Sequence, residues 1–281
     1  MTTRIDTRLT ADAKLTSSIV SERDRVPTGY SPLDEALHGG YPEGYAILLS
    51  SPSCDERDLL LRRFLEFEAD SGLTICLTRD LGRIADLAAA HRDSFYVVFC
   101  QDSKCALEMR NLVQTAGCDD LCSMNIAVSS ILRRVEPRLL GRRPRKLVID
   151  LISDVLLSRR AVITMNWLWD LIVRMKARGF TILGVLNPGM HPPEDAQAML
   201  ELFDGHISIE ERESDGGPRR LAMVRKMYAY GYDSSEVELD RDVLMRPLSP
   251  HPPEPYPRPP TAPPGCQQGP PTPTGRQKNR L

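Results

Sequence analysis

The feature that most constrains this chain is the stretch from Tyr45 to Leu65, where an apolar run, a short polar segment and an amphipathic run follow one another. Tyr45–Leu49 predicts a strand buried on both faces, and the spacing of apolar residues after Arg57 predicts a helix. A helix N-terminus just after a buried strand is where α/β proteins hold phosphate. The loop Ser50–Arg57, however, contains neither glycine nor lysine.

Apolar runs alternate with helical patterns along the rest of the chain. The expected strands are Leu73–Thr78, Phe95–Cys100, Lys146–Asp150 and Phe180–Leu186. The expected helices cover about 81–90, 106–115, 120–134, 160–178 and 193–202. Asp215-Gly-Gly217 predicts a hairpin joining His206–Glu211 to Arg220–Met227. This order predicts an α/β fold with a mainly parallel sheet, helices on both faces and an antiparallel C-terminal hairpin.

The two ends differ in composition from the middle. Residues 1–24 are polar with a weak apolar pattern, which predicts a flexible arm. Residues 25–246 carry all the expected elements and form the predicted core domain. Residues 247–281 contain 13 of the 23 prolines and almost no aliphatic side chains, so we expect a disordered tail of polyproline character.

Composition narrows the class of protein. A net charge of −2 gives no overall attraction to nucleic acid or anionic lipid. No apolar run approaches the roughly 20 residues that span a bilayer, and the N-terminus lacks the apolar core of a signal peptide, so we expect a cytoplasmic protein without a membrane partner.

The seven cysteines suggest reduced thiols rather than disulfides. Cys100, Cys105, Cys118 and Cys122 lack the paired spacing of a zinc site, and Cys118 and Cys122 are expected four residues apart on one helix, as buried thiols.

Three stretches, in order along the chain, resemble one family. Val26–Gly44 resembles the "TG-x-x-x-LD-x-x-x-x-GG-x-P-x-G" segment of KaiC-like ATPases of the RecA superfamily. Lys146–Asp150 is similar to their Walker B strand, and Phe203–Ile209 with Arg220–Met227 is similar to their C-terminal segment. The resemblance covers roughly residues 25–242. It implies a RecA-like core, ATP as the ancestral ligand, and assembly into rings or filaments.

The phosphate loop departs from the family pattern at every chemical position. A Walker A loop, G-x-x-x-x-G-K followed by Ser or Thr, cradles phosphate with backbone N–H groups and a lysine. Here Ser50, Ser53 and Asp55 stand at glycine positions, Glu56 at the lysine position and Arg57 at the hydroxyl position. A carboxylate about 4 Å from phosphate costs on the order of a few kcal/mol. We therefore expect a degenerate site with no cofactor, and ATP with Mg²⁺ only if binding is retained.

Three further positions are candidate relics of catalysis. Asp80 stands where the family carries acids after its second strand, although it also suits the N-cap of the next helix. Asp150 retains the Mg²⁺-site acid, but it also suits a structural role at the following turn. Lys226 is kept from the family's Lys-Met-Arg element, which reaches the neighbouring subunit's phosphate, while Tyr228 replaces the arginine.

Other surface candidates are weaker. The basic run containing Arg133, Arg134, Arg142, Arg143 and Arg145 suits either nucleic acid backbone or an ordinary solvated loop, and it lacks the aromatic residues that stack on bases. On the helix that carries both tryptophans, Trp167 is expected to be buried, and Trp169 suits a subunit interface.

The sequence thus predicts a non-catalytic, pseudo-ATPase-type regulatory or scaffold subunit. We expect it to act through homo- or hetero-oligomerisation with RecA-like subunits, with an unidentified signalling partner. Two alternatives remain: an ATPase with an unorthodox phosphate site around Arg57, Asp150 and Lys226, and a nucleic-acid-binding recombinase relative.

Overall fold

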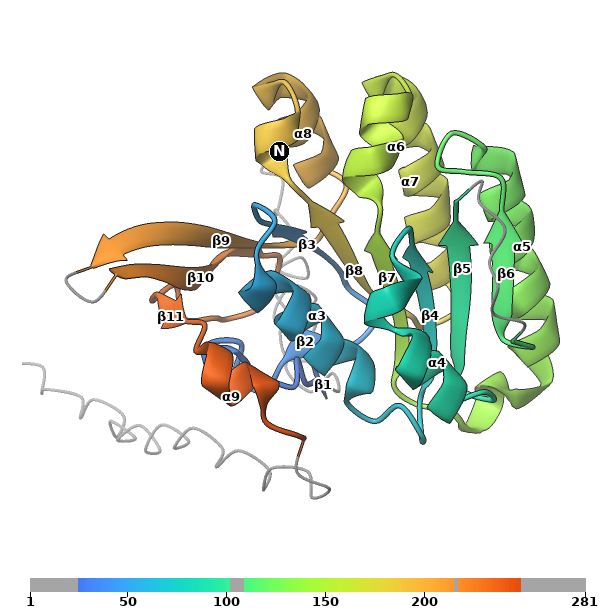
Figure 1. Cartoon of the computed structure of the whole chain (residues 1–281), viewed down its shortest axis with the longest axis horizontal. Coiled ribbons are helices and arrows are strands. Elements are labelled where there is room, and N and C mark those ends of the chain that lie inside the picture. Colours follow the sequence, from blue (N-terminus) through green and yellow to red (C-terminus); the bar gives the residue numbers. More distant parts are fainter. Residues whose placement is uncertain (1–24, 102–108, 215–216, 249–281) are drawn as a thin grey trace, which may run out of the picture. The chain divides into compact units, whose positions relative to one another are not determined.

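One mixed sheet organises the residues that the computed structural model describes, which are 25–101, 109–214 and 217–248 (Figure 1). Within these ranges nine strands pair in the order β11-β10-β9-β3-β8-β7-β4-β5-β6. Their bounds are β3 (Ala46–Ser50), β4 (Leu73–Thr78), β5 (Phe95–Cys100), β6 (Leu112–Thr115), β7 (Arg145–Asp150), β8 (Thr181–Leu186), β9 (Gly205–Ser214), β10 (Gly217–Met227) and β11 (Val237–Glu238). A separate two-stranded sheet pairs β1 (Arg25–Val26) with β2 (Tyr41–Pro42).

The strands from β9 to β6 run parallel, and β10 and β11 continue the sheet in antiparallel pairing. β3 lies between β8 and β9, so the strand before the phosphate-loop position is internal to the sheet. β9 and β10 extend beyond the parallel strands at the left of Figure 1. The predicted α/β fold, with its mainly parallel sheet and C-terminal antiparallel strands, is confirmed. The turn residues Asp215 and Gly216 lie outside the described residues.

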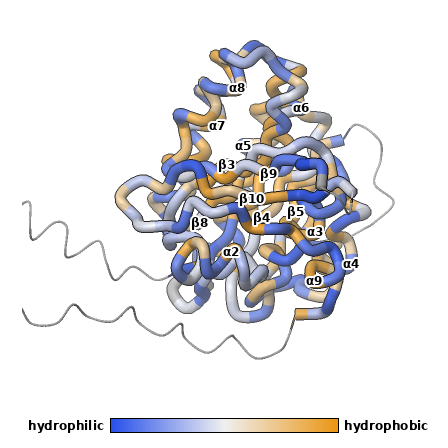
Figure 2. Tube along the Cα trace, turned by 90° about the vertical axis from the view of Figure 1, so that its left-hand side faces the viewer, coloured by the Kyte–Doolittle hydropathy of each residue, from blue (hydrophilic) through white to orange (hydrophobic). Residues whose placement is uncertain are grey.

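Helices cover both faces because the parallel strands are apolar on both. In β3, Ile47 and Leu49 join one core while Ala46 and Leu48 join the other. The first core lies under α2 (Ser31–Ala36), α3 (Asp55–Glu66), α4 (Ala85–Ala90) and α9 (Arg241–Met245). The second lies under α5 (Leu121–Val135), α6 (Ile152–Ser158), α7 (Ala161–Lys176) and α8 (Pro193–Leu200). The central strands accordingly appear as apolar segments in Figure 2.

Two cations fix α3 in place. Lys146 is fully buried, and its Nζ donates to the carbonyl oxygens of Phe64 at 2.7 Å and Leu65 at 3.3 Å, and also to that of Phe67. These carbonyls belong to the end of α3, where helix groups lack intrahelical partners. The Arg63 guanidinium donates to the carbonyl of Leu244 at 2.8 Å and so ties α9 to α3. The helix that begins at the phosphate-loop position is therefore anchored at its C-terminal end.

Several local predictions were wrong. The expected helix over 106–115 is in its described part a strand, β6, because Leu112–Thr115 pairs with β5 and tertiary pairing overrides the helical spacing. α6 was not expected. Cys118 precedes α5 instead of sharing it with Cys122, and the Cys122 thiol is exposed.

The arm predicted over 1–24 lies outside the described residues, as does the tail from residue 249 onward. In the part of the chain that is described, no helix is both long and apolar enough to cross a bilayer.

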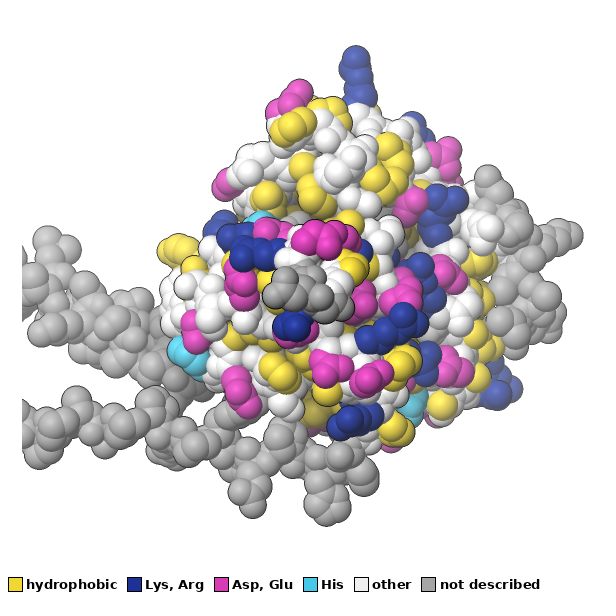
Figure 3. Space-filling model, turned by 60° about the vertical axis from the view of Figure 1, so that its left-hand side comes forward, with side chains coloured by type: hydrophobic (Ala, Val, Ile, Leu, Met, Phe, Trp, Pro, Cys, Tyr) yellow, Lys and Arg dark blue, Asp and Glu magenta, His cyan; other side chains and the backbone are white. Residues whose placement is uncertain are grey.

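The antiparallel end of the sheet carries charges of both signs, as Figure 3 shows for the face that presents the β9–β10 pair. Several of these charges pair across strands. Arg220 pairs with Glu211, and Arg225 pairs with Glu210. Arg212 on β9 lies 2.6 Å from Glu236, which directly precedes β11. This end of the sheet therefore presents paired charges of both signs rather than a patch of one sign.

Candidate functional site

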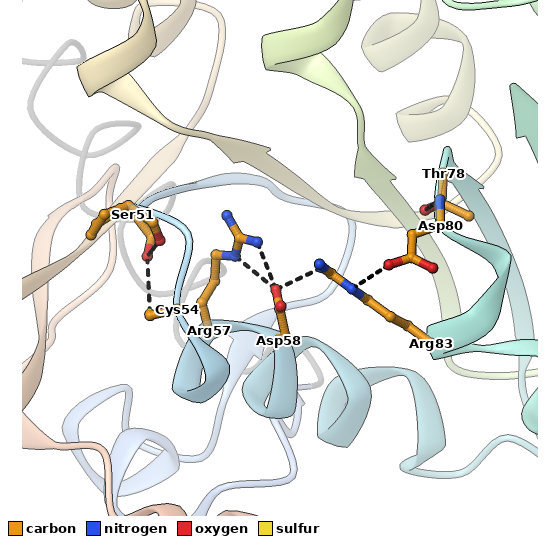
Figure 4. A network of polar contacts seen from close by, with 8 residues as sticks. Ser51, Cys54, Arg57, Asp58, Thr78, Asp80 and Arg83 are labelled. Carbon is orange, nitrogen blue, oxygen red and sulfur yellow. Dashed lines mark hydrogen bonds and ion pairs between the residues drawn. The ribbon is translucent and has the colours of Figure 1, made fainter. Parts of the chain in front are cut away.

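The phosphate-loop position lies between β3 and α3, as the sequence predicts, and several of its polar groups are held by contacts within the chain (Figure 4). The backbone N–H of Ser51 donates to the Leu186 carbonyl at 2.9 Å, and its hydroxyl donates to the Pro52 carbonyl at 2.7 Å. Cys54 occupies the N-cap of α3 without a side-chain cap. With no glycine in the loop, the backbone lacks the freedom from which a phosphate cradle is built.

The residues at the glycine and lysine positions point to separate partners. Ser50 Oγ lies 2.7 Å from His206 Nε2 on the neighbouring strand β9. Ser53 is exposed. Asp55 pairs with Arg241 at 2.9 Å, and the Glu56 carboxylate lies 3.9 Å from Arg220.

Arg57, at the position of the Mg²⁺-binding hydroxyl, is buried and bonded within its own helix. Its Nε and Nη2 donate to Oδ1 of Asp58 at 2.9 and 2.7 Å. The same oxygen lies 2.8 Å from Nη1 of Arg83, whose Nε lies 2.7 Å from Asp80. The result is a chain of alternating charges, Arg57–Asp58–Arg83–Asp80, that connects α3 with the segment after β4 (Figure 4).

This chain borders a cavity of about 220 Å³ at the carboxyl ends of β4, β7 and β8, where ligands bind in open α/β sheets. Its charged lining residues are Arg57, Arg79, Arg83, Asp80, Asp150 and Asp154. Arg79 pairs with Asp154 at 2.6 Å. Three cations thus meet three carboxylates, so the lining has no net positive charge to attract a polyphosphate.

Asp150, at the end of β7, differs from the other acids of this cavity. Among the described residues no hydrogen bond or ion pair reaches its carboxylate. Burial raises the pKa of Asp150 to about 6, although the charges of Arg57 and Arg83 act in the opposite direction. Leu151, not Asp150, is the N-cap of α6, so the structural role considered for Asp150 at the following turn is not found.

Asp80 also departs from its expected structural role. It occupies the N-cap position of the 3₁₀ turn η2 (Leu81–Arg83), but its side chain makes no capping hydrogen bond there. Its carboxylate pairs instead with Arg83, three residues later.

These residues do not fit Mg²⁺-ATP. Mg²⁺ takes oxygen ligands, whereas Arg57 presents a guanidinium, which has only donors. The positive charge of Arg57 already acts on Asp150. The first turn of α3 carries Asp55, Glu56 and Asp58, so the N-terminal dipole that would attract phosphate is already matched by carboxylates.

Lys226 does not join the other candidates. Its Nζ donates to the Phe203 carbonyl at 3.2 Å, and it lines a different cavity, together with Ser50, His206 and Arg225. Arg57 and Asp150 therefore share a cavity, while Lys226 is turned toward another.

The basic run is largely used in contacts within the chain. Arg142 donates to the Gly72 carbonyl at 3.2 Å, Arg143 to the Glu43 carboxylate at 2.8 Å, and Arg145 to the Arg178 carbonyl at 2.7 Å. Arg134 donates to the Arg110 carbonyl, and Arg133 is exposed at the end of α5. These contacts join segments of the chain to one another, so most arginines of the basic run have a structural role.

Sequence reasoning missed Asp58, Arg83 and Asp154 as parts of this site. The spacing of Asp80 and Arg83 was the one available signal, since residues three apart in a helical turn can pair. The contacts of Arg83 with Asp58 and of Asp154 with Arg79 cross between elements and leave no mark in the local pattern.

Comparison with known proteins supports the fold. No protein-family model matches the sequence, and no curated protein matches it. Among solved structures, a KaiC-like protein from the hyperthermophilic archaeon Pyrococcus horikoshii aligns with a TM-score of 0.59 and 16% identity, covering 77% of this chain and 95% of that one. At this identity the likeness concerns the fold. The chain therefore has the RecA-type fold of KaiC-like proteins.

Proposed function

We propose that this chain is a non-catalytic, pseudo-ATPase subunit that acts as a regulatory or scaffold component in an oligomer of RecA-like subunits. The observation that carries the proposal is the ion pair of the buried Arg57 with the partly buried Asp58, beside Asp150. A cation supplied by the chain takes the position where the family binds Mg²⁺ through a hydroxyl.

The energetic argument follows from this pair. A nucleotide entering the cavity would have to separate Arg57 from Asp58 or approach the carboxylates with its own negative charge. Each like-charge contact at about 4 Å costs on the order of a few kcal/mol. Separating the buried Arg57 from its carboxylate partner adds the cost of leaving a buried guanidinium without its charged partner. Neither a glycine cradle nor a lysine offsets these costs.

Assembly is supported by the outer face of α7. Val162, Trp169 and Val173 are 67%, 53% and 48% exposed. Their spacing of seven and four residues places them on one side of the helix. An exposed tryptophan among aliphatic residues is typical of the core of a protein interface. We propose that this face contacts a RecA-like subunit and that the proline-rich tail serves as a tether for a signalling partner.

The test is a titration of the full chain with a fluorescent ATP analogue and Mg²⁺, combined with sedimentation of the same samples. We expect no saturable binding at micromolar nucleotide and an assembly state that ATP does not change. Micromolar binding that Asp150→Ala abolishes would instead support the unorthodox ATPase.

The nucleic acid alternative has its own discriminating measurement. Single-stranded DNA binding that weakens with salt and disappears in the Arg142→Glu/Arg143→Glu variant would support a recombinase relative. We expect no binding at physiological salt.

A further inference from the structure

A further cavity, of about 320 Å³, lies beneath α3, between that helix, the segment after β4, strands β4 and β7, and α9. Most of its wall is apolar: Leu59, Leu61, Leu65, Cys76, Ile84, Val148 and Met245. Its volume falls at the lower end of the roughly 300–1,000 Å³ typical of small-molecule pockets. An apolar cavity of this size suits a compact organic ligand better than a chain of waters.

The polar part of the wall consists of paired charges with one exception. Asp55 pairs with Arg241 at 2.9 Å, and Asp58 with Arg83 at 2.8 Å. Arg83 also holds Asp80, and Arg62 holds Glu66 at 2.8 Å and pairs with Asp86. Each guanidinium that lines the cavity therefore forms an ion pair with a carboxylate.

The exception is Asp150. It borders this cavity and the smaller polar one, together with Thr78, Asp80 and Arg83. Among the described residues its carboxylate accepts no hydrogen bond, although the residue is partly buried. A carboxylate in such surroundings is stabilised by a donor, and most strongly by a cation.

From this geometry we infer that the cavity beneath α3 binds a small amphipathic amine, with its ammonium group on Asp150 and its apolar body between Leu61, Leu65, Cys76 and Val148. An anionic ligand of the same shape would meet an unpaired carboxylate and guanidinium groups that already have partners. A neutral ligand would gain the apolar contacts but not the charge-assisted hydrogen bond. The inference goes beyond the proposed function and does not depend on whether ATP binds.

The experiment compares three probes of similar shape on the full chain: 2-phenylethylamine, 2-phenylethanol and phenylacetate. Affinities come from isothermal titration, and saturation-transfer NMR confirms contact of the phenyl ring with the protein. We expect saturable binding of the amine, at least 10-fold tighter than binding of the alcohol, and no measurable binding of the acid.

Variants locate the site. Asp150→Asn is expected to remove the preference for the amine while leaving binding of the alcohol unchanged. Cys76→Met, which adds volume to the cavity wall, is expected to weaken amine and alcohol alike. Leu147→Met is the matched control, because Leu147 is equally buried but belongs to the core on the other face of the sheet.

Failure of the amine to bind at 10 mM would overturn the inference. So would equal affinity for all three probes, or amine binding that neither Asp150→Asn nor Cys76→Met changes. If a lysine-containing peptide binds while the free amine does not, the site recognises a protein side chain and the proposed ligand class is wrong.

Discussion

The Arg57 guanidinium donates two hydrogen bonds, of 2.9 and 2.7 Å, to a single carboxylate oxygen of Asp58, the next residue in the same helix. Residues adjacent in a helix do not normally face each other, so the long arginine side chain has to fold back across the helix surface. Arg57 is buried, and Asp58 is shared with Arg83. Within the first turn of α3, the Asp58 carboxylate thus neutralises Arg57 at the position where a phosphate loop would bind Mg²⁺.

A double-mutant cycle measures this pair. Asp58→Asn is expected to lower the free energy of unfolding by about 1–3 kcal/mol, because it leaves the buried guanidinium with only a neutral partner. Arg57→Met should cost less, because it removes the buried charge. The double variant should be more stable than the sum of the two losses predicts, with a coupling of at least 0.5 kcal/mol in urea unfolding. Strict additivity would contradict a direct interaction.

Restoring the phosphate loop tests the role of Arg57 as a substitute for the metal. The quadruple variant Ser53→Gly/Asp55→Gly/Glu56→Lys/Arg57→Thr should bind Mg²⁺-ATP in the micromolar range, because it supplies the cradle, the lysine and the hydroxyl. The triple variant that keeps Arg57 is the matched control, and we expect it to bind at least 10-fold more weakly. Titration with the fluorescent analogue measures both. Equal affinity would show that Arg57 does not obstruct the site.

Asp150 is predicted to reduce stability at neutral pH. Its pKa is about 6 in the folded chain, against about 4 in an unfolded one. Between these values the folded state binds more protons, so stability falls as the pH rises from about 4 to about 6, and the cost persists above that range. Asp150→Asn should therefore raise the free energy of unfolding by about 1–3 kcal/mol at pH 7.5 and have little effect at pH 4.

Burial also raises the pKa of Asp34 to about 6, so Asp34 changes the stability of the protein over the same pH range. Subtracting the wild-type values from those of Asp150→Asn removes this contribution. An equal effect of Asp150→Asn at both pH values would contradict the assignment.

The outer face of α7 is predicted to mediate assembly. Trp169→Ala should shift the protein toward the monomer, with at least a 10-fold weaker association in sedimentation, because exposed tryptophans are frequent hot spots. Ile126→Ala on α5, which is 60% exposed, is the control for loss of an apolar surface residue. Acrylamide should quench Trp169 in the monomer and not in the oligomer, while the buried Trp167 stays protected throughout.

The architecture of the sheet and most of its elements could be predicted from the sequence. Apolar strands alternating with helical patterns, and a glycine-containing hairpin signal near the C-terminus, follow from local periodicity, and the observed sheet agrees with them. The sequence also determined that the loop after β3 lacks a glycine cradle, since residue identity alone decides that. Where the local pattern was ambiguous, as at Leu112–Thr115, pairing with β5 decided the outcome and the prediction of a helix was wrong.

Only the tertiary structure decided what the altered residues do. The contact of Asp58 with Arg83 joins residues 25 positions apart, and Lys146 reaches the carbonyls of α3 across about 80 residues. No periodic pattern encodes such contacts, because they depend on which strands and helices become neighbours. The same holds for Asp150. Its position after an apolar strand is visible in the sequence, but its lack of a partner and its place between two cavities arise from packing.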